Sequence, residues 1–146
     1  MNEALSPMFS HFIQRLVSAL LLIVSFFTPA KPEKVMLRVV SASAEEVVIE
    51  FKNETGRTIT PEQRWLLEKQ TEQGWEAVPF AEDLAWNDVA EICRPNAVGR
   101  RTIHAVRCFG APLSVGVYRF SFSYVCGETP FGGGGPRTAN IIFDIV

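Results

Sequence analysis

The chain has 146 residues, 47% of them hydrophobic and 21% charged, so it can bury the core of one domain but not of two ordinary ones. Its 14 Lys and Arg against 16 Asp and Glu give a formal charge of −2, which excludes bulk electrostatic attraction to nucleic acid or to an anionic membrane. Nine prolines and ten glycines separate short apolar runs, a composition that favours many brief strands over a helical bundle.

The N-terminal segment has the layout of an export signal. Arg15 precedes an apolar run at residues 16–27, and the small residues Thr28 and Ala30 follow it. As a helix this run would measure about 18 Å at ~1.5 Å per residue, less than a hydrocarbon layer of roughly 30 Å. We therefore expect a signal peptide at residues 1–30, cleaved after Ala30.

The mature domain then comprises residues 31–146 and lies outside the cytoplasm, either secreted or in the cell envelope. Two alternatives remain for residues 1–30: an uncleaved anchor and a buried amphipathic helix. We expect membrane contact only through the uncleaved anchor. Glu3 is unusual in a basic leader, so translation can start at Met1 or at Met8.

Alternating apolar and polar residues predict strands in the first half of the mature chain. Residues 35–40 and 47–52 show the period of two that is typical of extended chain. Residues 65–69 and 75–78 flank a polar turn that contains Gly74, and we expect them to form a hairpin.

A second hairpin is predicted after the acidic, irregular stretch at residues 79–88. Residues 89–93 and 101–107 read as its strands, and residues 94–99 read as its loop because they contain Pro, Asn and Gly.

The clearest strand spans residues 117–126, where Phe120, Phe122 and Tyr124 alternate with polar residues and must share a buried face. Residues 138–146 form the last expected strand. The total of about seven to nine strands, with turns every eight to twelve residues, predicts an all-β sandwich of two antiparallel sheets behind the N-terminal signal helix.

One motif resembles a known structural device. Leu113, Gly116 and Tyr118 follow the spacing of the tyrosine corner of immunoglobulin-like sandwiches, in which the tyrosine hydroxyl bonds back to the chain near the leucine. With the surrounding runs at residues 65–69 and 110–118, the chain is similar to small bacterial Ig-like (Big-type) domains of secreted and surface proteins. The resemblance implies the fold and the extracytoplasmic location, and it carries no catalytic residues.

Three cysteines allow at most one internal disulfide. In a sandwich of this type, Cys93 and Cys126 both open loops at one end, whereas Cys108 lies at the other. We therefore predict a Cys93–Cys126 disulfide, with three buried free thiols as the alternative.

No active site, metal site or cofactor is expected. His104 and Cys108 lie four residues apart on a predicted strand, hence about 13 Å apart at ~3.3 Å per residue, too far for a nucleophile and its base. His104 is also the only histidine after Ala30, which excludes a histidine-rich metal centre.

Charge is unevenly distributed once loops are assigned to the two ends of the sandwich. One end has seven basic residues against Glu54, Glu62 and Glu128, and the other collects Glu45, Glu46, Glu72, Glu82 and Asp83. The basic residues are Lys52, Arg57, Arg64, Arg94, Arg100, Arg101 and Arg137.

Five of these arginines, Arg57, Arg94, Arg100, Arg101 and Arg137, form a candidate anion-binding pole. We expect a non-enzymatic binding or structural module that docks an anionic envelope protein or polymer. The alternative is a small secreted inhibitor or chaperone that adds a strand to another protein's sheet.

Overall fold

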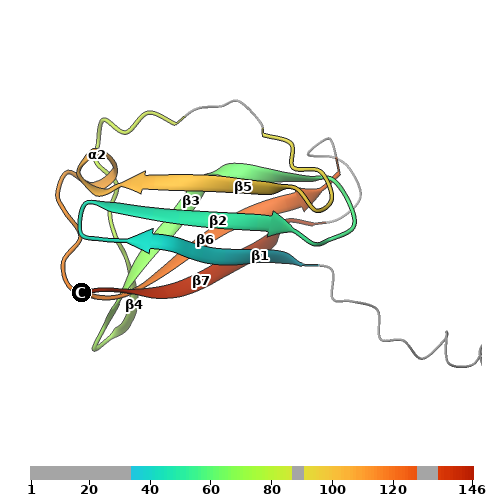
Figure 1. Ribbon diagram of the computed structural model, residues 1–146. Coiled ribbons are helices and arrows are strands. Elements are labelled where there is room, and N and C mark those ends of the chain that lie inside the picture. Colours follow the sequence, from blue (N-terminus) through green and yellow to red (C-terminus); the bar gives the residue numbers. More distant parts are fainter. Residues whose placement is uncertain (1–33, 87–90, 128–134) are drawn as a thin grey trace, which may run out of the picture. The chain divides into compact units, whose positions relative to one another are not determined.

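The computed structural model describes residues 34–86, 91–127 and 135–146, which form two antiparallel sheets (Figure 1). The three-stranded sheet has the order β1-β2-β5, with β1 at Val35–Ala42, β2 at Glu46–Asn53 and β5 at Val98–His104. The four-stranded sheet has the order β4-β3-β6-β7. Its strands are β3 (Ile59–Thr71), β4 (Gly74–Ala77), β6 (Gly116–Cys126) and β7 (Arg137–Ile145). The predicted all-β sandwich is confirmed.

The core lies between the sheets and is built on the alternation in β6. Tyr118, Phe120, Phe122 and Tyr124 are all buried, and the residues between them are only half-buried. The ring centroids of Phe122 and of Phe51 on β2 lie 5.6 Å apart, which joins the two sheets. Aromatic side chains of this size account for much of the apolar area that a small sandwich removes from water.

The predicted first hairpin is confirmed, because β3 pairs with β4 from Glu68 to Thr71. The predicted second hairpin is wrong. β5 pairs with β2, so its partner lies far back in the sequence, and Cys93 forms only an isolated bridge with Ile59.

The predicted strand at residues 101–107 also ends early, because helix α2 (Ala105–Phe109) begins after His104. Ala105 and Cys108 are the buried residues of α2, and their spacing of three puts both on one face of a helical turn. Gly110, with a φ of 80°, ends the helix in the left-handed conformation that glycine adopts without strain.

The strands run between two ends of the sandwich, and three connections meet at one of them (Figure 1). We call this the loop end. It contains residues 54–58, residues 93–97 and Gly127 after β6. Backbone hydrogen bonds join these segments: Ile59 exchanges two with Cys93, at 2.9 and 2.8 Å, and Gly127 N donates to Thr58 O at 2.8 Å. Helix α2 lies at the opposite end.

The expected signal peptide at residues 1–30 lies outside the described residues. Within the described part of the chain, no helix has the length and apolar character needed to cross a bilayer.

Candidate functional site

The loop end is organised around one buried amide. Asn53 is fully buried at the end of β2, and its Nδ2 donates to Arg57 O at 2.7 Å and to Cys93 O at 2.9 Å. Its Oδ1 accepts hydrogen bonds from the Thr55 backbone N at 3.0 Å and hydroxyl at 2.8 Å. A buried amide with both ends satisfied fixes the groups it contacts. Asn53 therefore sets the positions of the loops at residues 54–58 and 93–97.

Three of the five predicted arginines lie at this end. Arg57 follows β2, Arg94 precedes β5 and Arg137 begins β7, and all three side chains are exposed. None forms an ion pair within the described residues, whereas the nearby Lys52 Nζ lies 3.0 Å from Glu54 Oε1. We call Arg57, Arg94 and Arg137 the arginine end.

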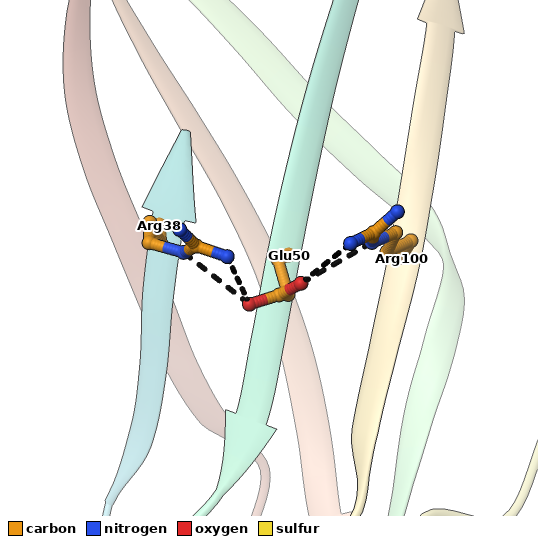
Figure 2. A network of polar contacts seen from close by, with 3 residues as sticks. All are labelled: Arg38, Glu50 and Arg100. Atoms are coloured by element: carbon orange, nitrogen blue, oxygen red, sulfur yellow. Dashed lines mark hydrogen bonds and ion pairs between the residues drawn. The ribbon is translucent and has the colours of Figure 1, made fainter. Parts of the chain in front are cut away.

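Arg100 belongs to a different surface, the outer face of the three-stranded sheet. Figure 2 shows Glu50 on β2 between Arg38 on β1 and Arg100 on β5. Arg38 Nη2 lies 2.8 Å from Glu50 Oε1, and Arg100 Nη2 lies 3.2 Å from Oε2. The hydrogen bond from Arg38, with a smaller contribution from Arg100, lowers the pKa of Glu50 although partial desolvation opposes this. Two guanidinium groups share one carboxylate, so one positive charge remains in excess.

Arg101 points to the other side of β5, toward the four-stranded sheet. Its Nη2 donates to Glu62 O at 3.0 Å, and its guanidinium carbon lies 6.0 Å from the centre of the Phe122 ring. Burial lowers the pKa of Arg101, and the nearby Glu91 opposes that effect. The predicted five-arginine pole is therefore three separate surfaces: the arginine end, the outer face with Arg100, and the side of the sandwich with Arg101.

The residues of the predicted tyrosine corner lie together. Tyr118 Oη donates to Ser114 O at 2.7 Å, next to the buried Leu113. Gly116 has a φ of 152°, and a β-carbon there would lie 2.6 Å from Lys69 Cε. The hydrogen bond from Tyr118 to Ser114 stabilises the connection between α2 and β6, and nothing in the chemistry of this corner indicates a ligand.

The three cysteines are buried free thiols. Cys93 and Cys126 are at the same end as predicted, but Ile59 pairs with Cys126 on one side and with Cys93 on the other. The chain at Ile59 therefore lies between the two cysteines. Twice the spacing of neighbouring strands puts the Cα atoms of Cys93 and Cys126 about 10 Å apart, beyond the ~4.4–6.8 Å that a disulfide spans. The predicted Cys93–Cys126 disulfide is therefore absent, because a third strand lies between its partners.

The distance argument against His104 and Cys108 needs correction, because the chain turns into α2 after His104 and both residues line one groove. His104 Nδ1 lies 3.1 Å from Glu46 Oε2, and burial raises the pKa of the Cys108 thiol. A raised pKa disfavours the nucleophilic thiolate. Among the described residues, no three His, Cys, Asp or Glu side chains gather as metal ligands.

An aromatic cluster at the side of the sandwich was not predicted. Trp65 on β3 contacts the rings of Phe80, Trp86, Phe109 and Phe120, with centroids 5.0 to 6.0 Å apart. Trp86 and Phe80 belong to the stretch at residues 79–88 that reads as acidic connection in the sequence. The sequence does contain a signal for this cluster, because two large aromatic residues are unusual in a connection that is exposed to solvent.

Comparison with known proteins gives a family and a distant structural likeness. No curated protein matches the chain. One solved structure, the archaellum periplasmic stator protein FlaG from Sulfolobus acidocaldarius, is 19% identical, with a TM-score of 0.45 over 75% of this chain and all of that one. A family model, described as a bacterial Ig-like domain, matches residues 34–128. The chain therefore belongs to the bacterial Ig-like domain family, as the tyrosine corner and the run of strands indicated.

Proposed function

We propose that this protein is an exported, non-enzymatic module of the cell envelope that docks an anionic partner through the arginine end. The observation that carries the proposal is the unpaired charge there. Arg57, Arg94 and Arg137 are exposed and form no ion pair within the described residues. Arginine presents several donors in a planar fork that fits carboxylates and phosphates.

The rigidity of the loops supports docking to an extended partner. Asn53 holds the chain next to both Arg57 and Arg94, so the two guanidinium groups project from fixed backbone. A preorganised surface loses less conformational entropy when it binds than a flexible one. The family membership and the leader pattern at residues 1–30 support a location outside the cytoplasm.

A double substitution tests the docking proposal. We expect Arg57→Ser/Arg94→Ser to reduce cosedimentation of the purified protein with isolated envelope fractions at low salt. The matched control, Arg38→Ser/Arg100→Ser, removes the same charge from the outer sheet face and should cosediment like the unsubstituted protein. Equal losses of cosedimentation in both variants would show that only the net charge of the protein matters. No loss in either variant would refute the proposal.

The export proposal has its own test. The N-terminal sequence of the protein recovered from outside the cytoplasm should begin at Lys31. Recovery of the whole chain in the cytoplasm would contradict export, and an exported form that retains residue 20 would contradict the cleavage site.

The alternative function, strand addition, is favoured by one observation. β7 is the outer strand of the four-stranded sheet and pairs with β6 alone among the described strands, although β1 of the other sheet lies beside it (Figure 1). An unpaired strand edge can accept a strand from another protein. Increased protection of β7 amides against hydrogen exchange upon partner binding would favour this alternative over the arginine end.

A further inference from the structure

A groove of about 180 Å³ opens at the side of the sandwich, between β3, β5, α2 and the chain before residue 87. Trp65 and Trp86 form its apolar part, and Arg101, Arg107 and His104 supply its basic groups. Among the described residues, no Asp or Glu lines it. The groove is thus apolar on one side and basic on the other, a combination suited to an organic anion.

Arg101 lacks the carboxylate partner that the half-buried Arg119 has. Arg119 Nε lies 2.7 Å from Glu68 Oε2, and the outer-face arginines share Glu50. In the part of the chain that the structure describes, no carboxylate lies within ion-pair distance of Arg101, and its buried Nε has no hydrogen-bond acceptor. Glu91 acts on Arg101 only from beyond ion-pair distance. A partly desolvated guanidinium without a carboxylate in contact is unfavourable, so a bound anion would supply that contact.

The aromatic side of the groove is held in place from behind. The ring centroids of Trp65 and Trp86 lie 5.8 Å apart, nearly edge to face, and Phe80 contacts both at 5.0 Å. Such packing fixes two indole rings beside the basic groups. Thr102, whose side chain is exposed, adds a hydroxyl to the lining.

We propose that this groove binds a carboxylated saccharide. The sugar carboxylate would lie against Arg101 and Arg107, and the apolar face of the ring would pack on Trp65 and Trp86. The hydroxyls at the rim of the ring would meet Thr102 and solvent. Carboxylate recognition by arginine requires a negative charge on the ligand, and the indole rings favour a ligand with an apolar C–H face over a small inorganic ion. This site is separate from the arginine end and does not depend on docking there.

Titration with digalacturonate tests the proposal, with its methyl ester as the uncharged control. We expect saturable binding of the acid, shifts of the Trp65 and Trp86 indole N–H resonances, and affinity that falls with added salt. The methyl ester should bind at least about tenfold more weakly, because it loses charge-assisted hydrogen bonds. Benzoate serves as a third probe, and tighter binding of benzoate than of digalacturonate would overturn the assignment to a sugar.

Neighbouring arginines on β5 give matched variants. Arg101→Met should weaken digalacturonate binding at least about tenfold, whereas Arg100→Met, on the opposite face, should leave it within about twofold. Equal weakening by both would refute the groove. If Arg101→Met does not fold, Arg107→Met on the surface of α2 carries the same test, and unchanged affinity there would refute the proposal. Arg57→Ser/Arg94→Ser should bind digalacturonate normally, which separates this site from the docking proposal.

Discussion

The ring of Phe51 on β2 packs directly over the backbone of Gly99 on β5, its partner in the sheet. A β-carbon at residue 99 would overlap the ring, with Cε1 at 2.6 Å and Cε2 at 2.9 Å. Gly99→Ala should therefore lower the free energy of unfolding by about 1–3 kcal/mol, the usual range for overpacking. Urea denaturation measures the change.

Gly135→Ala is the matched control for that substitution, because no atom of the described residues beyond its chain neighbours lies within 4 Å of the position its β-carbon would take. We expect it to leave the free energy of unfolding nearly unchanged. A similar loss of stability in both variants would show that the loss does not come from the contact with Phe51, because the smaller entropy of an unfolded chain with alanine acts in the opposite direction.

The Tyr118 hydroxyl stabilises the tyrosine corner by donating a hydrogen bond of 2.7 Å to Ser114 O, and its oxygen also lies 3.3 Å from Ser114 Oγ. Tyr118→Phe keeps the buried ring and removes the donor, so we expect unfolding to become easier by about 1 kcal/mol. Tyr124→Phe is the control on the same strand, because its hydroxyl forms no hydrogen bond within the described residues. We expect a lower midpoint of thermal unfolding for Tyr118→Phe than for Tyr124→Phe. Equal midpoints would contradict a stabilising role of the corner.

Glu50 should make stability depend on pH. Its pKa lies below the ordinary value of 4.5 in the folded protein, so the unfolded chain binds the proton more readily. The stabilisation is complete above about pH 4.5 and is lost as the pH falls through the lowered pKa. Glu50→Gln should therefore destabilise the protein at neutral pH, and its difference from the unsubstituted protein should shrink in acid.

Denaturant titrations at neutral pH and in acid measure this difference. The exposed Glu62, which forms no ion pair within the described residues, provides the control variant Glu62→Gln. A Glu50→Gln difference that grew as the pH fell would have the wrong sign for a carboxylate held by Arg38 and Arg100.

The cysteines should remain reduced while the fold is intact. All three are buried, and burial raises the pKa of Cys93 and Cys108. A thiol that stays protonated reacts slowly with disulfide reagents. We expect almost no labelling of the native protein and three labelled thiols after unfolding. A Cys93–Cys126 peptide in a non-reducing digest of the native protein would contradict the position of Ile59 between them.

The sandwich could be predicted because its main signal is local. Alternation along β6 decides which side chains are buried, and the aromatic residues from Tyr118 to Tyr124 occur at every second position. The pairing of β5 with β2 could not be predicted in the same way, because no feature near Val98 identifies a partner some fifty residues earlier. Helix α2 was missed because five residues are too few to show a helical period.

The candidate site was predicted only in part for a similar reason. Arg57, Arg94 and Arg137 were assigned correctly to one end because turn residues mark their loops. Arg100 and Arg101 are grouped with the loop at residues 94–99 in the sequence-based assignment of charge to the two ends, although both lie within β5, where consecutive side chains point to opposite faces. The alternation seen in the other strands, continued through residues 98–104, puts the two arginines on opposite faces.

The buried amide of Asn53 has a consequence for partner choice. Since one carboxamide donates to the carbonyls of Arg57 and Cys93, it sets the separation of the backbone at Arg57 and next to Arg94. Under the docking proposal, a ligand whose negative groups recur at that interval would contact both arginines at once, and one with denser or sparser charge would contact only the first. The repeat length of an anionic polymer would then matter more to binding than its total charge.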